Sequence, residues 1–167
     1  MIEIPESGVT FGPFQTDSIF QIEKSTNLPQ SSKPVEFVFL SSNNKSLVLV
    51  EAKSSFSKPE NNIDFDKNLN EIYQKIVDSI SVLLCAHIGR HSKIREELPE
   101  KIKSLNWAKI DIKIRLVIPS FHKEWLPPIT DALRNRLRHF LQSTGIPYMN
   151  FQVLNQELAL KQNLIKK

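Results

Sequence analysis

The hydrophobic side chains recur at two different spacings along the chain, and each spacing predicts a different kind of element. Alternation with a period of two predicts strands at residues 34–40 and 108–120. Residues 47–53 are apolar almost throughout, which is typical of a central strand that is covered on both faces. Because only the short polar segment 41–46 separates the first of these strands from the segment 47–53, we expect the two to form an antiparallel hairpin.

Apolar residues at spacings of three and four predict helices. The pattern is strongest at 64–88, where Gly89 marks the end, and at 129–141. The shorter segment 16–24 also has helical spacing, and it places Glu23 on the inward, apolar face of that helix. Weaker patterns predict an irregular lead-in at 1–15 with a short strand near 9–11, a helix at 91–105 that Pro99 interrupts, a strand at 148–154 and a helix at 156–166.

The order helix, strand, strand, long helix, strand, helix predicts an α/β protein with a mixed central sheet flanked by helices. A length of 167 residues, with 40% hydrophobic and 24% charged residues, fits one globular domain over 1–167. The single cysteine, Cys85, excludes an intrachain disulfide, and no apolar run reaches the ~18 residues of a membrane span. Because the N-terminus also lacks the features of a secretory signal, we expect a cytoplasmic protein that is not in a membrane.

Charge is unevenly distributed along the chain. The formal net charge is +4, but residues 1–60 carry 5 Lys and Arg against 7 Asp and Glu, whereas residues 61–167 carry 17 against 11. An acidic N-terminal segment that carries the site and a basic remainder of the chain would suit a polyanionic partner held near a metal ion. A basic protein with no such partner is the alternative.

Charged side chains at the ends of the two hairpin strands are the candidates for chemistry. Glu51 and Lys53 share one face of a strand that is otherwise apolar, where charges are rarely buried without a reason. The antiparallel hairpin should bring Glu36 close to Glu51. Two close carboxylates repel each other unless one is protonated or a cation lies nearby, and Mg²⁺ serves better than Lys53 alone. The alternative is an ordinary exposed ion pair at a strand end.

These residues also carry a resemblance to a known family. The segments 35–38 and 50–53, with fourteen residues between Glu36 and Glu51, resemble the PD-(D/E)XK motif of restriction-endonuclease-like nucleases. The order of elements over residues 14–120 is similar to that fold as well. The resemblance implies a restriction-endonuclease-like α/β sandwich. The chain has Glu36 where the family usually has Asp.

The resemblance implies roles for four side chains. Glu36 and Glu51 would bind Mg²⁺ or Mn²⁺, and Glu23 would be an outer ligand of the metal. Lys53 would position or polarise the attacking water and stabilise the developing negative charge. The implied activity is metal-dependent hydrolysis of phosphodiester bonds in DNA, in a defence, restriction or repair setting. A homodimer or a place in a larger complex is also implied, because cutting a duplex needs two sites.

Other interpretations stay open. With Glu36 in place of Asp, the chain could be a catalytically inactive nuclease-like domain that binds nucleic acid or protein. It could also be an unrelated α/β domain in which the Glu-x-Lys string arises by chance. Arg134 and Arg138 share a helix face at i, i+4 spacing and are candidates for contacts with nucleic-acid phosphates, a solvated face being the alternative.

Overall fold

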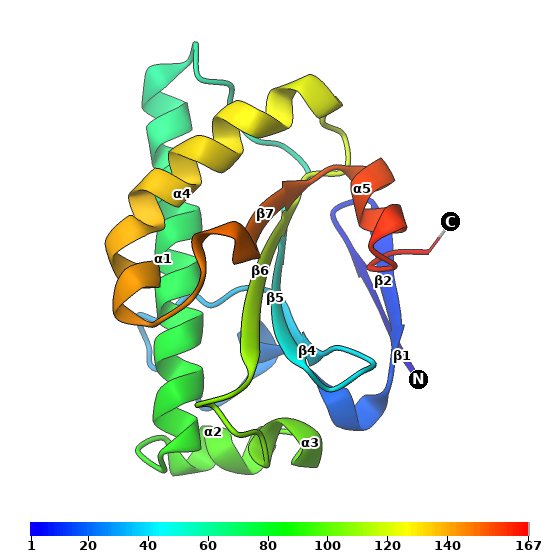
Figure 1. Cartoon of the computed structure of the whole chain (residues 1–167), viewed down its shortest axis with the longest axis vertical. Coiled ribbons are helices and arrows are strands. Elements are labelled where there is room, and N and C mark those ends of the chain that lie inside the picture. Colours follow the sequence, from blue (N-terminus) through cyan, green and yellow to red (C-terminus); the bar gives the residue numbers. More distant parts are fainter. Residues whose placement is uncertain (167) are drawn as a thin grey trace.

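A five-stranded mixed sheet forms the centre of the protein in the computed structural model, which describes residues 1–166 (Figure 1). The first three strands in the sheet order are antiparallel neighbours, and the last three are parallel neighbours. In sheet order the strands are β3 (Ile19–Phe20), β4 (Phe37–Leu40), β5 (Ser46–Ala52), β6 (Asp111–Val117) and β7 (Phe151–Leu154). The prediction of an α/β protein with a mixed sheet is confirmed.

Two long helices cover one face of this sheet. Helix α1 (Asn62–His87) connects β5 to β6, and helix α4 (Leu126–Ser143) connects β6 to β7, as parallel neighbours require. The Asn61 side chain caps the start of α1 by accepting a hydrogen bond from the Asp64 amide. Two short helices, α2 (Ser92–Glu97) and α3 (Glu100–Lys103), lie at the foot of the sheet in Figure 1.

The opposite face of the sheet is covered by a two-stranded hairpin and a short helix. The hairpin consists of β1 (Ile2–Glu6) and β2 (Val9–Phe14), and the helix is α5 (Gln156–Lys161). Phe11 of β2 is fully buried and meets the ring of Phe37 with the two centroids 5.3 Å apart. Strand β5 therefore lies between two layers, and every residue in it is buried.

The helix predicted at residues 16–24 is wrong. Ile19 and Phe20 instead form β3, which pairs with Phe39 and Val38 of β4. One turn of helical spacing is a weak pattern, and β-branched and aromatic residues such as these also favour strands. Tight 3₁₀ turns flank β3 at Thr16–Ser18 and Ile22–Lys24, and two more occur at Lys123–Trp125 and Tyr148–Asn150.

Smaller differences from the predicted elements have local causes. In the predicted lead-in at residues 1–15, the strand expected near 9–11 is part of a two-stranded hairpin, because its apolar residues pack on the central sheet. The predicted interruption of the helix at 91–105 is confirmed, since α2 and α3 lie on either side of Pro99, which cannot continue the hydrogen bonding of the preceding helix. Within residues 1–166, no helix is both long and apolar enough to cross a membrane.

The buried position of Phe11 predicts a large loss of stability on truncation. Phe11→Ala should lower the free energy of unfolding by about 3–5 kcal/mol, because it leaves a cavity under Phe37. Urea denaturation measures this loss. Ile63→Ala, at a side chain that is 83% exposed, is the control and should cost less than about 0.5 kcal/mol. Equal losses for both variants would show that the N-terminal hairpin is not part of the folded core.

Candidate functional site

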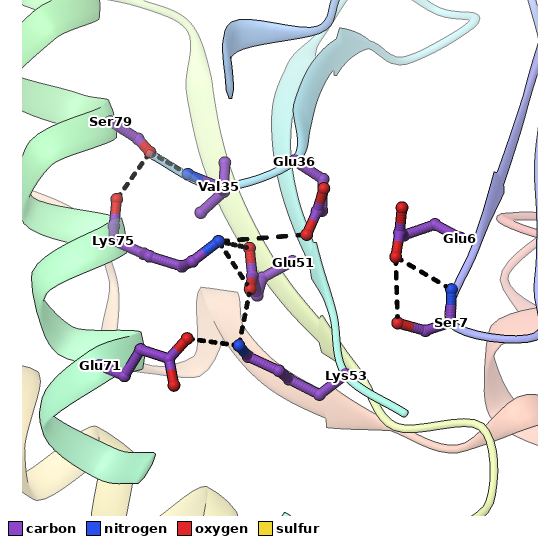
Figure 2. A network of polar contacts seen from close by, with 9 residues as sticks. All are labelled: Glu6, Ser7, Val35, Glu36, Glu51, Lys53, Glu71, Lys75 and Ser79. Carbon is purple, nitrogen blue, oxygen red and sulfur yellow. Dashed lines mark hydrogen bonds and ion pairs between the residues drawn. The ribbon is translucent and has the colours of Figure 1, made fainter. Parts of the chain in front are cut away.

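Glu36 and Glu51 lie side by side where the hairpin of β4 and β5 ends. Phe37 pairs with Val50, and Glu36 and Glu51 are the residues next to this last pair. The strand predicted to begin at residue 34 begins at Phe37, so Glu36 lies in a bend just before β4. Both side chains lie on the face of the sheet that is covered by α1 (Figure 2). The two side chains are 12% and 1% exposed. The predicted hairpin thus brings the two carboxylates together in a buried place.

Lys75 of α1 lies between these carboxylates. Its Nζ is 3.0 Å from Oε1 and 3.1 Å from Oε2 of Glu51, and 4.0 Å from Oε1 of Glu36. Figure 2 shows the side chain reaching from the helix toward both strands. Because Lys75 is itself only 14% exposed, its ammonium acts as a nearly dry counter-ion for Glu51.

Lys53 follows β5 directly and faces the same cluster. Its backbone amide donates to the carbonyl of Val117, which extends the pairing with β6 by one residue. Its Nζ lies 3.6 Å from Oε1 of Glu51 and forms an ion pair with Glu71 of α1. Burial acts to lower the pKa of Lys53, but the hydrogen bond from Lys53 to Glu71 and the charges of Glu71 and Glu51 outweigh it and raise that pKa. Lys53 is therefore a firmly charged ammonium at the rim of the site.

Ser79 fixes the helix against the start of β4. Its hydroxyl accepts a hydrogen bond from the Val35 amide at 2.8 Å and donates to the carbonyl of Lys75 at 2.6 Å. Glu71, Lys75 and Ser79 are spaced four apart, so they form one stripe along α1. Along this stripe, Lys75 contacts the two carboxylates, Glu71 contacts Lys53 and Ser79 contacts the start of β4.

The environment of Glu36 favours its protonated form. Burial, a hydrogen bond with the Glu23 side chain, and the negative charges of Glu51 and Glu23 together raise its pKa to about 8, against an opposing effect from Lys75. A neutral Glu36 carboxyl group next to an ionised Glu51 is the arrangement that avoids direct repulsion. The proton is consequently held at Glu36, and Lys75 is paired mainly with Glu51.

Glu51 also has a raised pKa, although its neighbours are cationic. Its burial raises the pKa, while Lys75 and Lys53 lower it and the charge of Glu71 raises it. The Oε1 atom is buried and accepts no hydrogen bond among the described residues, although the Lys75 ammonium lies within 3.0 Å. This oxygen is close to positive charge, yet it keeps an unused capacity to accept a donor or bind a cation.

The chemistry of the cluster suits a hard divalent cation held by two carboxylates. Mg²⁺ commonly binds proteins through one or two carboxylates and keeps several water ligands. Glu51, with its unused buried oxygen, and the adjacent Glu36 fit this description. Over residues 1–166, no group of three Asp, Glu, His or Cys side chains is arranged as a set of metal ligands. The fit therefore rests on two protein ligands.

Glu23 lies next to the cluster, but on a different structural element from the one predicted. The helix that was expected to place it on an inward face is absent, and Glu23 lies exposed on the 3₁₀ turn Ile22–Lys24. Its carboxyl group still contacts Glu36 through a side-chain hydrogen bond. The position of this third carboxylate is set by the turn that follows β3, which pairs with β4.

Arg134 and Arg138 lie away from this cluster. Two nitrogen atoms of the Arg134 guanidinium, Nε and Nη2, donate hydrogen bonds to the carbonyl of Phe151, at 3.1 and 2.8 Å. Phe151 begins β7, which is two strands away from β5. Arg134 therefore has a structural role at that edge, while Arg138 is exposed on α4.

Sequence reasoning missed Lys75 and Glu71. The sequence predicts helix α1 from its apolar positions alone and assigns no role to its polar residues. The available signal was the spacing of Glu71, Lys75 and Ser79, which puts a lysine within reach of any carboxylate buried under the helix. A buried Glu51 needs a compensating cation, and this spacing indicates where it comes from.

Comparisons of the chain with protein families, with curated proteins and with solved structures find no match. The resemblance to PD-(D/E)XK nucleases thus stays a prediction, and the geometry of the cluster carries the functional argument.

The contact between Lys75 and Glu51 predicts a strong dependence of stability on this lysine. Lys75→Met should lower the free energy of unfolding at neutral pH by about 3 kcal/mol or more, because it leaves a buried carboxylate without its counter-ion. Adding Glu51→Gln in the same chain should recover most of the loss. Urea denaturation of both variants measures these effects. Lys67→Met, at an exposed lysine of the same helix, is the matched control, and an equal loss there would contradict the proposed dependence.

The raised pKa of Glu36 predicts that its contribution to stability falls as pH rises. Between the ordinary value of 4.5 and about 8, the folded chain holds a proton that the unfolded chain has lost, so the free energy of unfolding decreases with pH. Glu36→Gln should remove this slope. Relative to wild type, the variant should gain at least about 1.4 kcal/mol between about pH 5 and pH 8.5, the equivalent of one pKa unit. Chemical denaturation at several pH values tests this, with the exposed Glu96→Gln as control; parallel pH profiles for wild type and Glu36→Gln would refute it.

Proposed function

We propose that this chain is a metal-dependent nuclease of the restriction-endonuclease-like class that hydrolyses phosphodiester bonds in DNA. One observation carries the proposal: Glu36, just before β4, and Glu51, near the end of β5, both lie within 4.0 Å of the Lys75 Nζ, and the Lys53 Nζ is 3.6 Å from Glu51. Two acids and a lysine at the ends of adjacent strands are the group of residues that such nucleases use. The strand order and the long helix between β5 and β6 support the same class.

The proposed mechanism assigns the carboxylates to binding the metal ion. Glu36 and Glu51 would hold Mg²⁺ or Mn²⁺, and Glu23 would act through its contact with Glu36. When bound, such an ion neutralises phosphate charge and lowers the pKa of a coordinated water molecule. Glu36 must lose its proton to serve as a ligand, and Lys75 holds both carboxylates together until a cation competes with its ammonium.

Lys53 has the properties required to act on the phosphate. It is charged, partly exposed, and held near Glu51 by strand pairing on one side and by Glu71 on the other. A fixed ammonium at this place would orient the attacking water and stabilise the negative charge that develops on the phosphorane oxygens. Because Glu71 is 41% exposed, its side chain has room to release Lys53 when an anionic substrate arrives.

The excess of basic residues in one part of the chain supports a polyanionic substrate. Residues 61–167, which include both long helices, carry the basic excess of the chain, and Arg138 is an exposed member of it. DNA is the proposed substrate, in a defence, restriction or repair setting. Cutting a duplex would take two copies of this site, supplied by a homodimer or by a larger complex.

Cleavage assays test the proposal. Supercoiled plasmid and labelled single strands are incubated with the protein and Mg²⁺ or Mn²⁺, with EDTA as the metal-free reference. Wild type should cut, and Lys53→Met or Glu51→Gln should each reduce the rate by about 100-fold or more, because each removes transition-state stabilisation. Lys93→Met, at an exposed lysine of α2, should cut like wild type. Cleavage that persists in Glu51→Gln would exclude this site.

A second candidate function is favoured by the ion pairs themselves. Glu51 is already compensated by Lys75, and Lys53 by Glu71, as expected for a catalytically inactive domain that binds nucleic acid or protein. Isothermal titration with Mg²⁺ separates the two candidates. Metal binding that Glu51→Gln abolishes favours the nuclease, whereas DNA binding without metal binding or cleavage favours the inactive module.

A further inference from the structure

A cavity of about 420 Å³ lies on the face of the sheet opposite the carboxylate cluster. It is partly open to solvent, and its lining comes from the end of β2, the end of β4, strand β6 and the segment that follows α5. The lining includes Phe14, Phe39, Ser42, Lys113, Arg115 and Gln162. Its volume falls within the range of about 300–1,000 Å³ that is typical of small-molecule sites.

Arg115 is the most unusual residue in this lining. It is only 7% exposed, and no carboxylate among residues 1–166 lies within ion-pair distance of its guanidinium. Burial lowers the pKa of Arg115 to about 10, and the charge of Asp111 only partly opposes this. A buried cation without a direct counter-ion is costly, and an anion would relieve that cost.

The guanidinium of Arg115 is held in one orientation. Its Nε donates to Oε1 of Gln162 at 2.9 Å, and its Nη1 donates to the carbonyls of Ile114 and Asn150 at 3.0 and 2.7 Å. Nη2 has no hydrogen-bond partner in the described part of the chain. Because Arg115 is one of the residues that line the cavity, Nη2 is the guanidinium nitrogen that remains available to a ligand there.

The other lining groups define the kind of ligand. Lys113 is the second cation, and its ion pair with Asp111 is loose, with Nζ and Oδ2 3.6 Å apart. None of the residues that line the cavity is acidic. On the apolar side, the rings of Phe14 and Phe39 pack with their centroids 4.6 Å apart. Cationic groups on one side and aromatic rings on the other suit an anion that carries a flat apolar part.

We propose that this cavity binds a small organic anion, with a phosphate or carboxylate on Arg115 and Lys113 and a ring against Phe14 and Phe39. The site is separate from the carboxylate cluster, because the side chain of Arg115 projects from the other face of the sheet, together with that of Val117. Binding here is independent of whether the chain cuts DNA.

Titration of the full chain by ¹H–¹⁵N NMR tests the proposal. The probes are adenosine monophosphate, benzoate, inorganic phosphate, and adenosine as the uncharged control. At least one organic anion should bind saturably, shifting the Arg115 Nε–H resonance and the amides of residues 15–18, 41–42 and 162–163. Binding of adenosine monophosphate would identify phosphate as the charged group that the cavity takes, and binding of benzoate would identify carboxylate. Inorganic phosphate should bind at least about tenfold more weakly than that organic anion, because it makes no contact with the rings.

Two charge reversals serve as matched variants. Lys113→Glu should weaken binding by about tenfold or more, whereas Lys93→Glu on α2 should leave it unchanged. Thermal unfolding confirms that each variant is folded, and the Arg115 Nε–H signal reports on the buried arginine without replacing it. The proposal is overturned if neither organic anion binds saturably, if adenosine or inorganic phosphate binds as tightly, or if Lys113→Glu binds like wild type.

Discussion

The ion pair between Glu51 of β5 and Lys75 of α1 is the interaction on which the geometry of the site depends. Strand β5 is buried at every residue, so a carboxylate at its end is removed from water on all sides. Burying such a charge costs several kcal/mol unless a cation comes with it. Helix α1 supplies that cation, and Ser79, one turn further on, ties the same helix to the start of β4. The position of the helix, the register of the hairpin and the place of Glu36 are therefore linked.

This link explains why a cluster of four glutamates and two lysines is compatible with a folded chain. Lys75 compensates Glu51, Glu71 compensates Lys53, and a shared proton relieves the contact between Glu36 and Glu23. With that proton in place, the cluster carries three negative and two positive charges, so its net charge is reduced to −1. Sites that concentrate like charges in this way commonly sacrifice stability for function. An arrangement whose sole purpose was stability would place apolar side chains at these positions.

The central part of the fold could be predicted from the sequence because its signals are local and repeated. The alternation around Phe37 and the long apolar run of β5 both persist over several residues, and so does the helical period of α1. Residues 16–24 lacked that repetition: Ile19 and Phe20 fit a helix turn as well as a strand, and pairing with β4 decided between them. For the same reason, only a short strand near residues 9–11 of the N-terminal hairpin is predicted, since the structure of the hairpin depends on packing against Phe37.

The candidate site was predictable in part. Glu51 and Lys53 stand out because they interrupt an apolar strand, and the antiparallel register that brings Glu36 to them follows from a short connection. Lys75 is distant in sequence from the two strands, and the spacing of Glu71, Lys75 and Ser79 along α1 is the signal that sets it apart from a solvated lysine. Its role follows only when the helix is placed on the sheet. Arg134 shows the reverse case, because a charge that suggested an outside partner is used on the carbonyl of Phe151.

The layer opposite the helices joins the two ends of the described chain. Phe11 bridges Ile165, the Gly12 amide donates to Leu164, and Lys166 pairs with both Thr10 and Glu3. These contacts span more than 150 residues of sequence, so their formation requires the closure of nearly the whole chain as one loop. Such long-range contacts raise the contact order and slow folding. They also make the chain suited to circular permutation, in which the neighbouring ends are joined and new ends are opened in an exposed turn such as Gly89–Arg90.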